Sequence, residues 1–297
     1  MKKYLLIAIF VCSFVWASTA SAITTIPDPD FEIIPGETIG ILHDDLYAES
    51  AKLNTLLGYE GFDIPTGTGG LDIIIFTGAG GADNDPVSGG FTFEDPLDAP
   101  GGGDSTFSGT WGLTGVSVDD IYGWLQSYDP LVKAPVINFD MNQTKPDPDV
   151  YVAGQMYVWD PLANDGAGGV VDFWALDGIE NDAFDAPDLG DLTDAAWVVA
   201  EGVLDIGPYS VNHNLGSGKL DYIAFSKEMD LSLFLGQGYQ FRMDLYFAGL
   251  VNGFEEIYLT GNFIPGGDPG SPVPEPASML LLGSGLATAF LRRKLKA

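Results

Sequence analysis

The sequence predicts a mainly β protein: an antiparallel β-sandwich-like ectodomain with one or two short helices, plus a hydrophobic helix at the C-terminus. Three observations favour this fold. Apolar residues recur at every second position in several runs, most runs are bounded by Gly, Asp or Pro, and hydrophobic residues make up 46% of the chain. So much apolar side chain argues against disorder and for a sizeable core.

The N-terminal segment predicts export. Lys2 and Lys3 precede an apolar run, and small residues then lead to Ala22. This order is typical of a secretory signal peptide over residues 1–22. Cys12, the single cysteine of the chain, lies inside it, so the mature protein is expected to contain neither disulfides nor a catalytic thiolate.

The next segments are a β-rich ectodomain, residues 23–264, and a Pro/Gly linker, residues 265–272. The chain has 12 Lys+Arg and 42 Asp+Glu. Two of the cations precede residue 23 and four follow residue 272, whereas only Glu275 of the acids lies outside 23–272, which leaves a net charge of −35 between those limits. Such a charge repels nucleic acid and attracts divalent cations, so no nucleic-acid partner is expected.

The expected strands follow one another through the ectodomain. They are LDIIIFTGA (71–79), VYVAGQMYVWD (150–160), VVDFWALD (170–177), AAWVVAEGVLDIG (195–207), KLDYIAFS (219–226) and YQFRMDLYFAGL (239–250). In 150–160 both alternating sets of residues are largely apolar, which predicts a strand covered on both faces.

The run 239–250 alternates most regularly. The residues expected to point inward are Tyr239, Phe241, Met243, Leu245 and Phe247, and those expected to point outward are Gln240, Arg242 and Asp244. Asn252–Gly253 then predicts a type I′ hairpin that pairs this strand with residues 254–263.

Two helices are expected between the strands. Residues 43–58 place Leu46, Leu53 and Leu57, together with Leu42, on a helical face that ends at Gly58. Residues 117–128 begin with a capping box and then line up apolar side chains. The capping residues are Ser117 and Asp120, and the apolar face is Ile121, Trp124, Leu125 and Tyr128.

No local motif predicts catalysis. His43 and His213 are the only histidines, and no G-x-S-x-G elbow accompanies them. We therefore expect a protein that is not an enzyme and requires no cofactor. A carboxylate pair hidden among the many acids stays open as an alternative, since such a pair leaves no local signature.

One acidic pattern suggests a metal. Aspartates recur every third residue in an irregular stretch, at Asp182, Asp185, Asp188, Asp191 and Asp194. Closely spaced carboxylates and loop carbonyls suit Ca²⁺, which takes 6–8 oxygen ligands, and a solvated loop is the alternative. Trp111, Trp124, Trp159, Trp174 and Trp197 lie in expected elements, where they serve either the core or a sugar-stacking surface.

The last residues, 273–297, read VPEPASMLLLGSGLATAFLRRKLKA. Their apolar part, 277–291, would be a helix of about 22 Å at ~1.5 Å per residue, a short membrane span with its cations on the cytoplasmic side. This tail resembles the PEP-CTERM sorting signal. The resemblance rests on Pro274, Glu275 and Pro276, then the apolar segment, then Arg292, Arg293 and Lys294.

The resemblance implies recognition of the Pro-Glu-Pro residues by exosortase, a processing enzyme of the membrane. It also implies export through the inner membrane of a Gram-negative bacterium that makes exopolysaccharide, with the tail held in that membrane before processing. We therefore expect a non-catalytic protein of the cell surface or extracellular matrix, associated with polysaccharide. The alternatives are a secreted carbohydrate-active hydrolase and a structural coat protein without ligand.

Overall fold

The protein is mainly β, as predicted. The computed structural model describes residues 24–35, 37–59, 61–62, 70–76, 84, 86–99, 105–140, 150–177, 198–200, 203–206, 209–212, 219–250 and 256–264. All of these belong to one compact unit, Ile23–Pro269. Of the pairings between described strands, only β1 with β18 and β6 with β7 are parallel.

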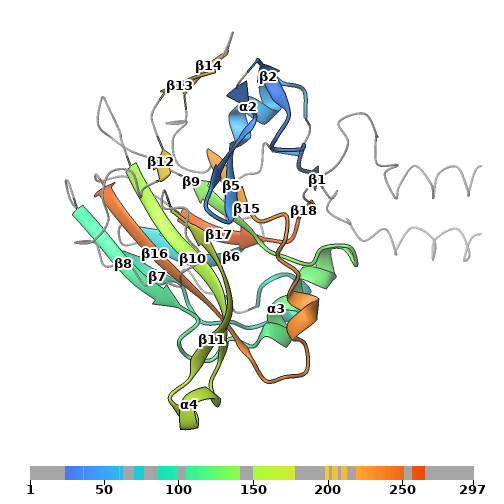
Figure 1. The fold of residues 1–297 in the computed structure, drawn as a ribbon, viewed down its shortest axis with the longest axis vertical. Helices are drawn as coiled ribbons and strands as arrows, with labels where there is room; N and C mark the ends of the chain where they lie inside the picture. The colour runs from blue at the N-terminus through green and yellow to red at the C-terminus, as the bar shows by residue number, and fades with distance from the viewer. Residues whose placement is uncertain are drawn as a thin grey trace, which may run out of the picture. The chain divides into compact units, whose positions relative to one another are not determined.

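One sheet is built from long strands that lie side by side in Figure 1. Its order is β11 (Gly169–Leu176), β10 (Val150–Asp160), β16 (Gln240–Leu250) and β8 (Ser105–Trp111), and β12 (Val198–Ala200) also pairs with β10. The predicted strand 150–160 is confirmed at both ends as β10, and 239–250 is confirmed as β16. These two strands pair without interruption from Tyr151↔Ala248 to Trp159↔Gln240. We call this the five-stranded sheet.

A second sheet, which we call the seven-stranded sheet, contains shorter strands. Its order is β4 (Gly40–His43), β5 (Leu46–Ser50), β15 (Tyr222–Phe225), β9 (Val136–Asp140), β17 (Glu256–Thr260), β6 (Leu71–Phe76) and β7 (Leu97–Ala99). β17 lies between β9 and β6, and its pairing with β6 shifts register between Ile257 and Tyr258. This shift affects which side chains share a face of the sheet.

Both sheets contribute to the same hydrophobic cluster. Its members include Met156, Phe241 and Phe247 from the five-stranded sheet and Leu71, Ile137 and Ile257 from the seven-stranded sheet. The inward set predicted for 239–250 is confirmed, because Phe241, Met243, Leu245 and Phe247 are fully or almost fully buried and Tyr239 packs against the cluster. Such alternation places one face of each strand in the core.

The predicted helix at 117–128 is also confirmed. It is α3 (Val118–Tyr128), and the Ser117 hydroxyl accepts a hydrogen bond from the Asp120 backbone N–H at 3.3 Å. Its buried face, which includes Ile121, Trp124 and Leu125, joins the shared cluster. The Tyr128 ring meets that of Trp124 edge-on at 5.4 Å. The helix therefore forms part of the core.

The remaining elements are short. They are α4 (Ala163–Gly166), η1 (Ser88–Gly90), η3 (Leu231–Phe234) and the pairs β1 (Thr24–Thr25) with β18 (Phe263–Ile264), β2 (Glu32–Ile34) with β3 (Glu37–Thr38), and β13 (Val203–Ile206) with β14 (Tyr209–Asn212). The run 195–207, predicted as one strand, contains the two short strands β12 and β13.

The helix predicted over 43–58 is wrong in its first half. Residues 40–50 form the hairpin β4–β5, whose turn places Asp44 at φ 56°, and only α2 (Ala51–Leu56) is helical. The segment is a strand because β5 pairs with β15, a distant partner that the leucine spacing does not reveal. The end was predicted correctly, since Gly58 follows the helix with φ +92°.

The hairpin predicted around Asn252–Gly253 is also wrong in its pairing. β16 pairs with β10 and β8, whereas β17 pairs with β9 and β6, so the chain passes from one sheet to the other between them. The Asn-Gly residues lie outside the described residues. The hairpin signal is local, and the sheet partners of both strands come from distant parts of the chain.

Candidate functional site: buried polar faces of the two sheets

The face of the five-stranded sheet that points away from the shared cluster is centred on Asp244. The strand register places Gln155 on β10 and Thr110 on β8 directly opposite it. Its carboxylate accepts hydrogen bonds from Thr110 Oγ1 at 2.6 Å, Gln155 Nε2 at 2.8 Å and Tyr157 OH at 3.3 Å. Asp244 is only 4% exposed, so its three donors take the place of water.

This position corrects a prediction. Residues 240, 242 and 244 were expected to face outward, and they do point away from the shared cluster. However, Asp244 is buried, and Gln240 and Arg242 are only half exposed. β16 lies between two long strands, and its polar side chains meet partners on those strands.

Next to this network, Arg242 and Trp159 pack against each other. The Arg242 guanidinium carbon lies 4.4 Å from the centre of the indole ring, a cation–π contact, and Nη2 donates to Gln240 Oε1 at 2.8 Å. Gly168 abuts the same indole so closely that an added Cβ would lie 2.2 Å from its Cζ2 atom. Trp159 is therefore held between a cation and backbone.

These contacts bear on the sugar-stacking interpretation of the tryptophans. Trp111 and Trp124 are fully buried, and Trp174 is 7% exposed, so these three serve the core. Trp159 has one ring face covered by Arg242. Trp197 lies outside the described residues. Among the tryptophans of the described segments, Trp159 alone is partly exposed, and Arg242 already occupies a position over its ring.

The face of the seven-stranded sheet that points away from the shared cluster, which we call its outer face, carries buried acids. Glu256 on β17 lies opposite Asp140 on β9, and Tyr258 lies opposite Asp72 on β6. The Asp72 and Glu256 carboxyl groups are hydrogen-bonded to each other. Burial, and secondarily the negative charge of Asp72, raises the pKa of Glu256 to about 8. A pair of this kind holds a proton near neutral pH.

A further buried acid lies on β5 of the same sheet. Glu49 is 1% exposed and accepts a hydrogen bond from Asn54 Nδ2 at 2.8 Å. Burial raises the pKa of Glu49 to about 8, against the opposing effect of that hydrogen bond. Glu49 lies near the end of β5 and Glu256 begins β17. Neither position carries a sequence signal for burial, because both acids stand next to other polar residues in the sequence.

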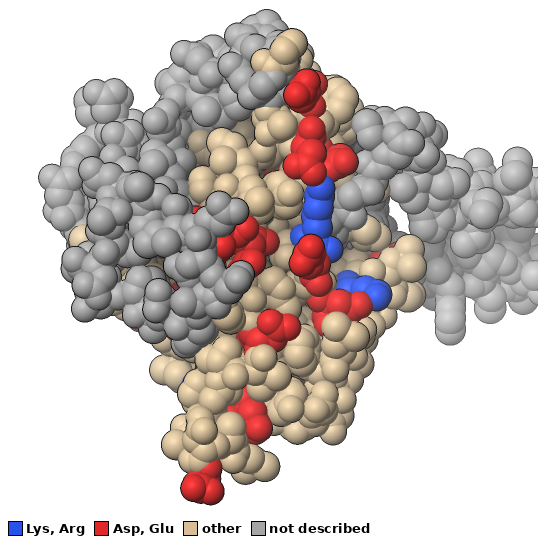
Figure 2. All heavy atoms as spheres, viewed as in Figure 1, with Lys and Arg blue, Asp and Glu red and all other residues tan. Residues whose placement is uncertain are grey.

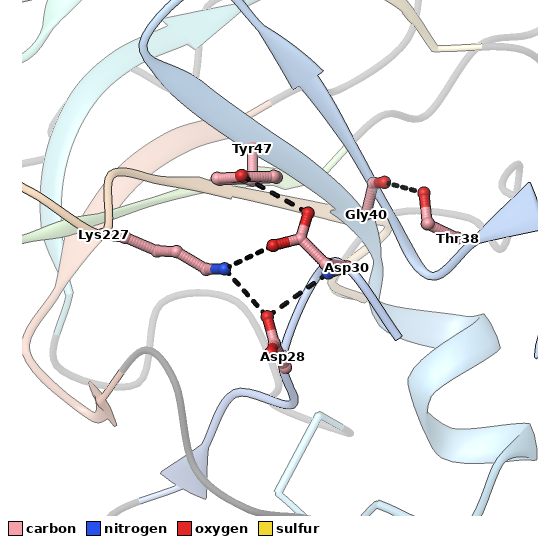
Figure 3. A network of polar contacts seen from close by, with 6 residues as sticks. All are labelled: Asp28, Asp30, Thr38, Gly40, Tyr47 and Lys227. Atoms are coloured by element: carbon pink, nitrogen blue, oxygen red, sulfur yellow. Dashed lines mark hydrogen bonds and ion pairs between the residues drawn. The ribbon is translucent and has the colours of Figure 1, made fainter. Parts of the chain in front are cut away.

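At the surface, Lys227 joins the start of the domain to β5. Its ammonium contacts Asp28 Oδ1 and Asp30 Oδ2, both at 2.8 Å, and lies 5.0 Å from the centre of the Tyr47 ring (Figure 3). Burial alone would lower the pKa of Lys227, but the hydrogen bonds to the two aspartates outweigh it and raise the pKa. Basic side chains on the face in Figure 2 are bordered by acidic ones in the same way. This cluster fastens residues 28–30 in place.

The site residues predicted from sequence lie elsewhere. The aspartates of 182–194 and the sorting residues of the tail, with the apolar helix expected there, fall outside the described residues, as does His213. His43 ends β4, and burial lowers its pKa. Among described residues, no three His, Cys, Asp or Glu side chains are grouped so that they could hold a metal ion. The calcium site at 182–194 stays a prediction.

The search for membrane-spanning helices also covers the described residues alone. Across the described segments, no helix has both the length and the apolar character needed to cross a membrane.

Comparison with known proteins identifies the C-terminal tail. A family model described as the PEP-CTERM protein-sorting motif matches residues 272–294. This confirms the resemblance drawn from Pro274, Glu275 and Pro276 and the cationic end. Comparisons with curated proteins and with solved structures found no match. The chain thus carries the sorting motif of exported, exosortase-processed bacterial proteins.

Proposed function

We propose that this chain is a non-catalytic protein of the cell surface or extracellular matrix of a Gram-negative bacterium. Its two sheets form a sandwich-like ectodomain, exosortase removes its tail, and the mature protein associates with exopolysaccharide. The observation that carries the proposal is the sorting motif at residues 272–294. The motif accounts for the export of the protein, and the ectodomain is the part that would associate with polysaccharide.

Features of the ectodomain support the proposal. Its acidic surface suits a protein exported from the cell, and its buried polar networks link neighbouring strands through side chains. The carboxyl pair formed by Asp72 and Glu256 lies on a buried strand face, with Glu256 5% exposed. A glycosidase pair must instead flank a substrate. Because Trp111, Trp124 and Trp174 are buried and Arg242 lies over the Trp159 ring, we expect polysaccharide to be held mainly by surface hydrogen bonds, with modest affinity.

The experiment uses the processed protein, purified from the outer surface or medium of its producer. It is incubated with the producer's own polysaccharide, and co-sedimentation and new reducing ends are both measured. Heat-unfolded protein and an unrelated neutral glucan serve as controls. Binding to the producer's polysaccharide without new reducing ends is the expected result.

The two alternatives give different results. Reducing ends that appear with turnover, and vanish after a single Asp→Asn or Glu→Gln change, would identify a hydrolase and contradict the proposal. Neither co-sedimentation nor cleavage would favour a structural coat protein without ligand.

A further inference from the structure

The outer face of the seven-stranded sheet gathers acidic side chains from three neighbouring strands. Glu256 and Tyr258 are two residues apart on β17 and share a face. The register places Asp140 on β9 opposite Glu256, and the shift between Ile257 and Tyr258 places Asp72 on β6 opposite Tyr258. The four side chains therefore project from the same face of adjacent strands.

This cluster is removed from water. Glu256 is 5% exposed, Asp140 is fully buried and Asp72 is half-buried. Within the described residues, no Lys, Arg or His forms an ion pair with Asp72 or Glu256. Two ionised carboxylates in hydrogen-bonding contact inside a protein repel each other strongly, so one of the two must carry a proton.

Tyr258 also shows that the acidic cluster is shielded from water. Its side chain is 2% exposed, and its hydroxyl has no hydrogen-bond partner among the residues that the structure describes. The acids close enough to affect it electrostatically are Glu256, Asp140, Asp72 and Asp221. The phenol donates no hydrogen bond to these carboxyl groups, so it does not stabilise their ionised forms. Since the described residues provide no group of three metal-binding side chains, we consider protons rather than a metal ion.

We propose that the Asp72–Glu256 pair takes up one proton when the protein folds, and that this proton makes the seven-stranded sheet a pH-sensitive element. The sheet is most stable in acid and weakens as its surroundings become alkaline. This inference is independent of polysaccharide binding. The titratable groups next to the pair are Asp140 on β9 and Tyr258 on β17, and Asp221, just before β15, lies near Tyr258. All three are acidic or phenolic, so none of them supplies a compensating positive charge.

The direction of the pH effect follows from linkage. In the unfolded chain Glu256 titrates at its ordinary pKa of 4.5, whereas in the folded protein its pKa is about 8. Between these values the folded state binds up to one more proton than the unfolded state. The contribution of the pair to the folding equilibrium constant should therefore fall up to about tenfold per pH unit across this window and level off above it, and Glu49 adds a slope of its own.

The test is urea unfolding of the processed protein at pH 5, 6, 7, 8 and 9, as wild type and as Glu256→Gln. Glutamine has the shape of the protonated acid but does not titrate. We expect Glu256→Gln to reduce the slope of stability against pH by about one proton between pH 5 and 8. The matched control is Glu228→Gln, a change at an exposed position, which should leave the slope unchanged.

Two results would overturn the proposal. One is an unchanged slope in Glu256→Gln. The other is an increase in the stability of the wild type at pH 8 when Ca²⁺ is added, with no such increase in Glu256→Gln. That result would mean that the cluster binds a cation. If Glu256→Gln fails to fold, carbon NMR of the wild-type carboxyl groups decides instead. A carboxyl resonance that titrates near pH 8, and that Asp72→Asn shifts, is expected, whereas titration of all glutamates near pH 4 to 5 would contradict it.

Discussion

Thr110 on β8 donates a hydrogen bond of 2.6 Å to Asp244 on β16, although 134 residues separate them along the chain. The bond is short because the acceptor is a carboxylate held among donors in a buried setting. Gln155 Nε2 on β10 reaches the other carboxylate oxygen at 2.8 Å. Asp244 therefore connects three neighbouring strands of the five-stranded sheet through side chains as well as backbone.

Asp244→Asn should destabilise the protein by about 1–3 kcal/mol. The amide nitrogen would replace one carboxylate oxygen and face either Gln155 Nε2 or the hydroxyls of Thr110 and Tyr157. Donors buried there would lose their acceptor. Asp98→Asn, the same change at an exposed position of β7, should stay within about 0.5 kcal/mol of wild type. Urea unfolding measures both. Equal small effects would show that the network contributes little.

Gly168→Ala should be more destabilising than Gly166→Ala. Both glycines have positive φ, +85° and +89°, so both changes carry a backbone cost of about 1–2 kcal/mol. Nothing lies within 4 Å of a Cβ at Gly166, whereas a Cβ at Gly168 would overlap Trp159. The overlap should add about 1–3 kcal/mol.

A double-mutant cycle isolates that overlap. In a Trp159→Ala background the difference between the two glycine variants should shrink, because the ring that the new Cβ meets is gone. If the difference persists without the ring, the close approach of Gly168 to Trp159 is not its cause.

The calcium prediction concerns the aspartates of residues 182–194. A cation at 100 times its Kd should raise the free energy of unfolding by about 2.7 kcal/mol relative to chelator. A triple Asp→Asn variant at Asp185, Asp188 and Asp191 should lose this response. A variant with the same change of charge at exposed positions should keep it. Those positions are Asp95, Asp98 and Asp120. Superimposable melting curves of the wild type with calcium and with chelator would leave only a solvated loop.

Local patterns predicted the elements that local forces determine. The apolar residues on both faces of 150–160 predicted β10, whose residues 152–158 are all buried, and the alternation in 239–250 predicted β16, which has one face in the shared cluster. Ser117 predicted the start of α3 because a capping hydroxyl acts within one turn. These signals need no knowledge of distant residues.

The failures have a common physical cause. Leu46, Leu53 and Leu57 fit a helical spacing, but Leu46 lies in β5, whose pairing with β15 comes from a segment far along the chain. Asp244 was expected on an outward face, and its burial depends on donors from β8 and β10. The Asp72–Glu256 pair likewise forms only because β6 and β17 are neighbours in the sheet. Alternation shows that a side chain leaves the core face but does not show what it meets there.

Variants of the tail test whether processing depends on the Pro-Glu-Pro residues. Changing Pro274 and Pro276 together to Ala should leave the tail attached, because it removes the prolines that keep the recognition peptide extended. Pro265→Ala, in the linker before the motif, should be processed like wild type. Processing of both variants alike would separate the cleavage from the Pro-Glu-Pro residues.

The most direct measurement is mass spectrometry of the intact protein recovered from the outer surface or medium of its producer. The sorting motif at residues 272–294 predicts a mature form whose C-terminus lies near Pro274 to Pro276. Recovery of an exported form that still carries Arg292 to Ala297 would contradict processing by exosortase.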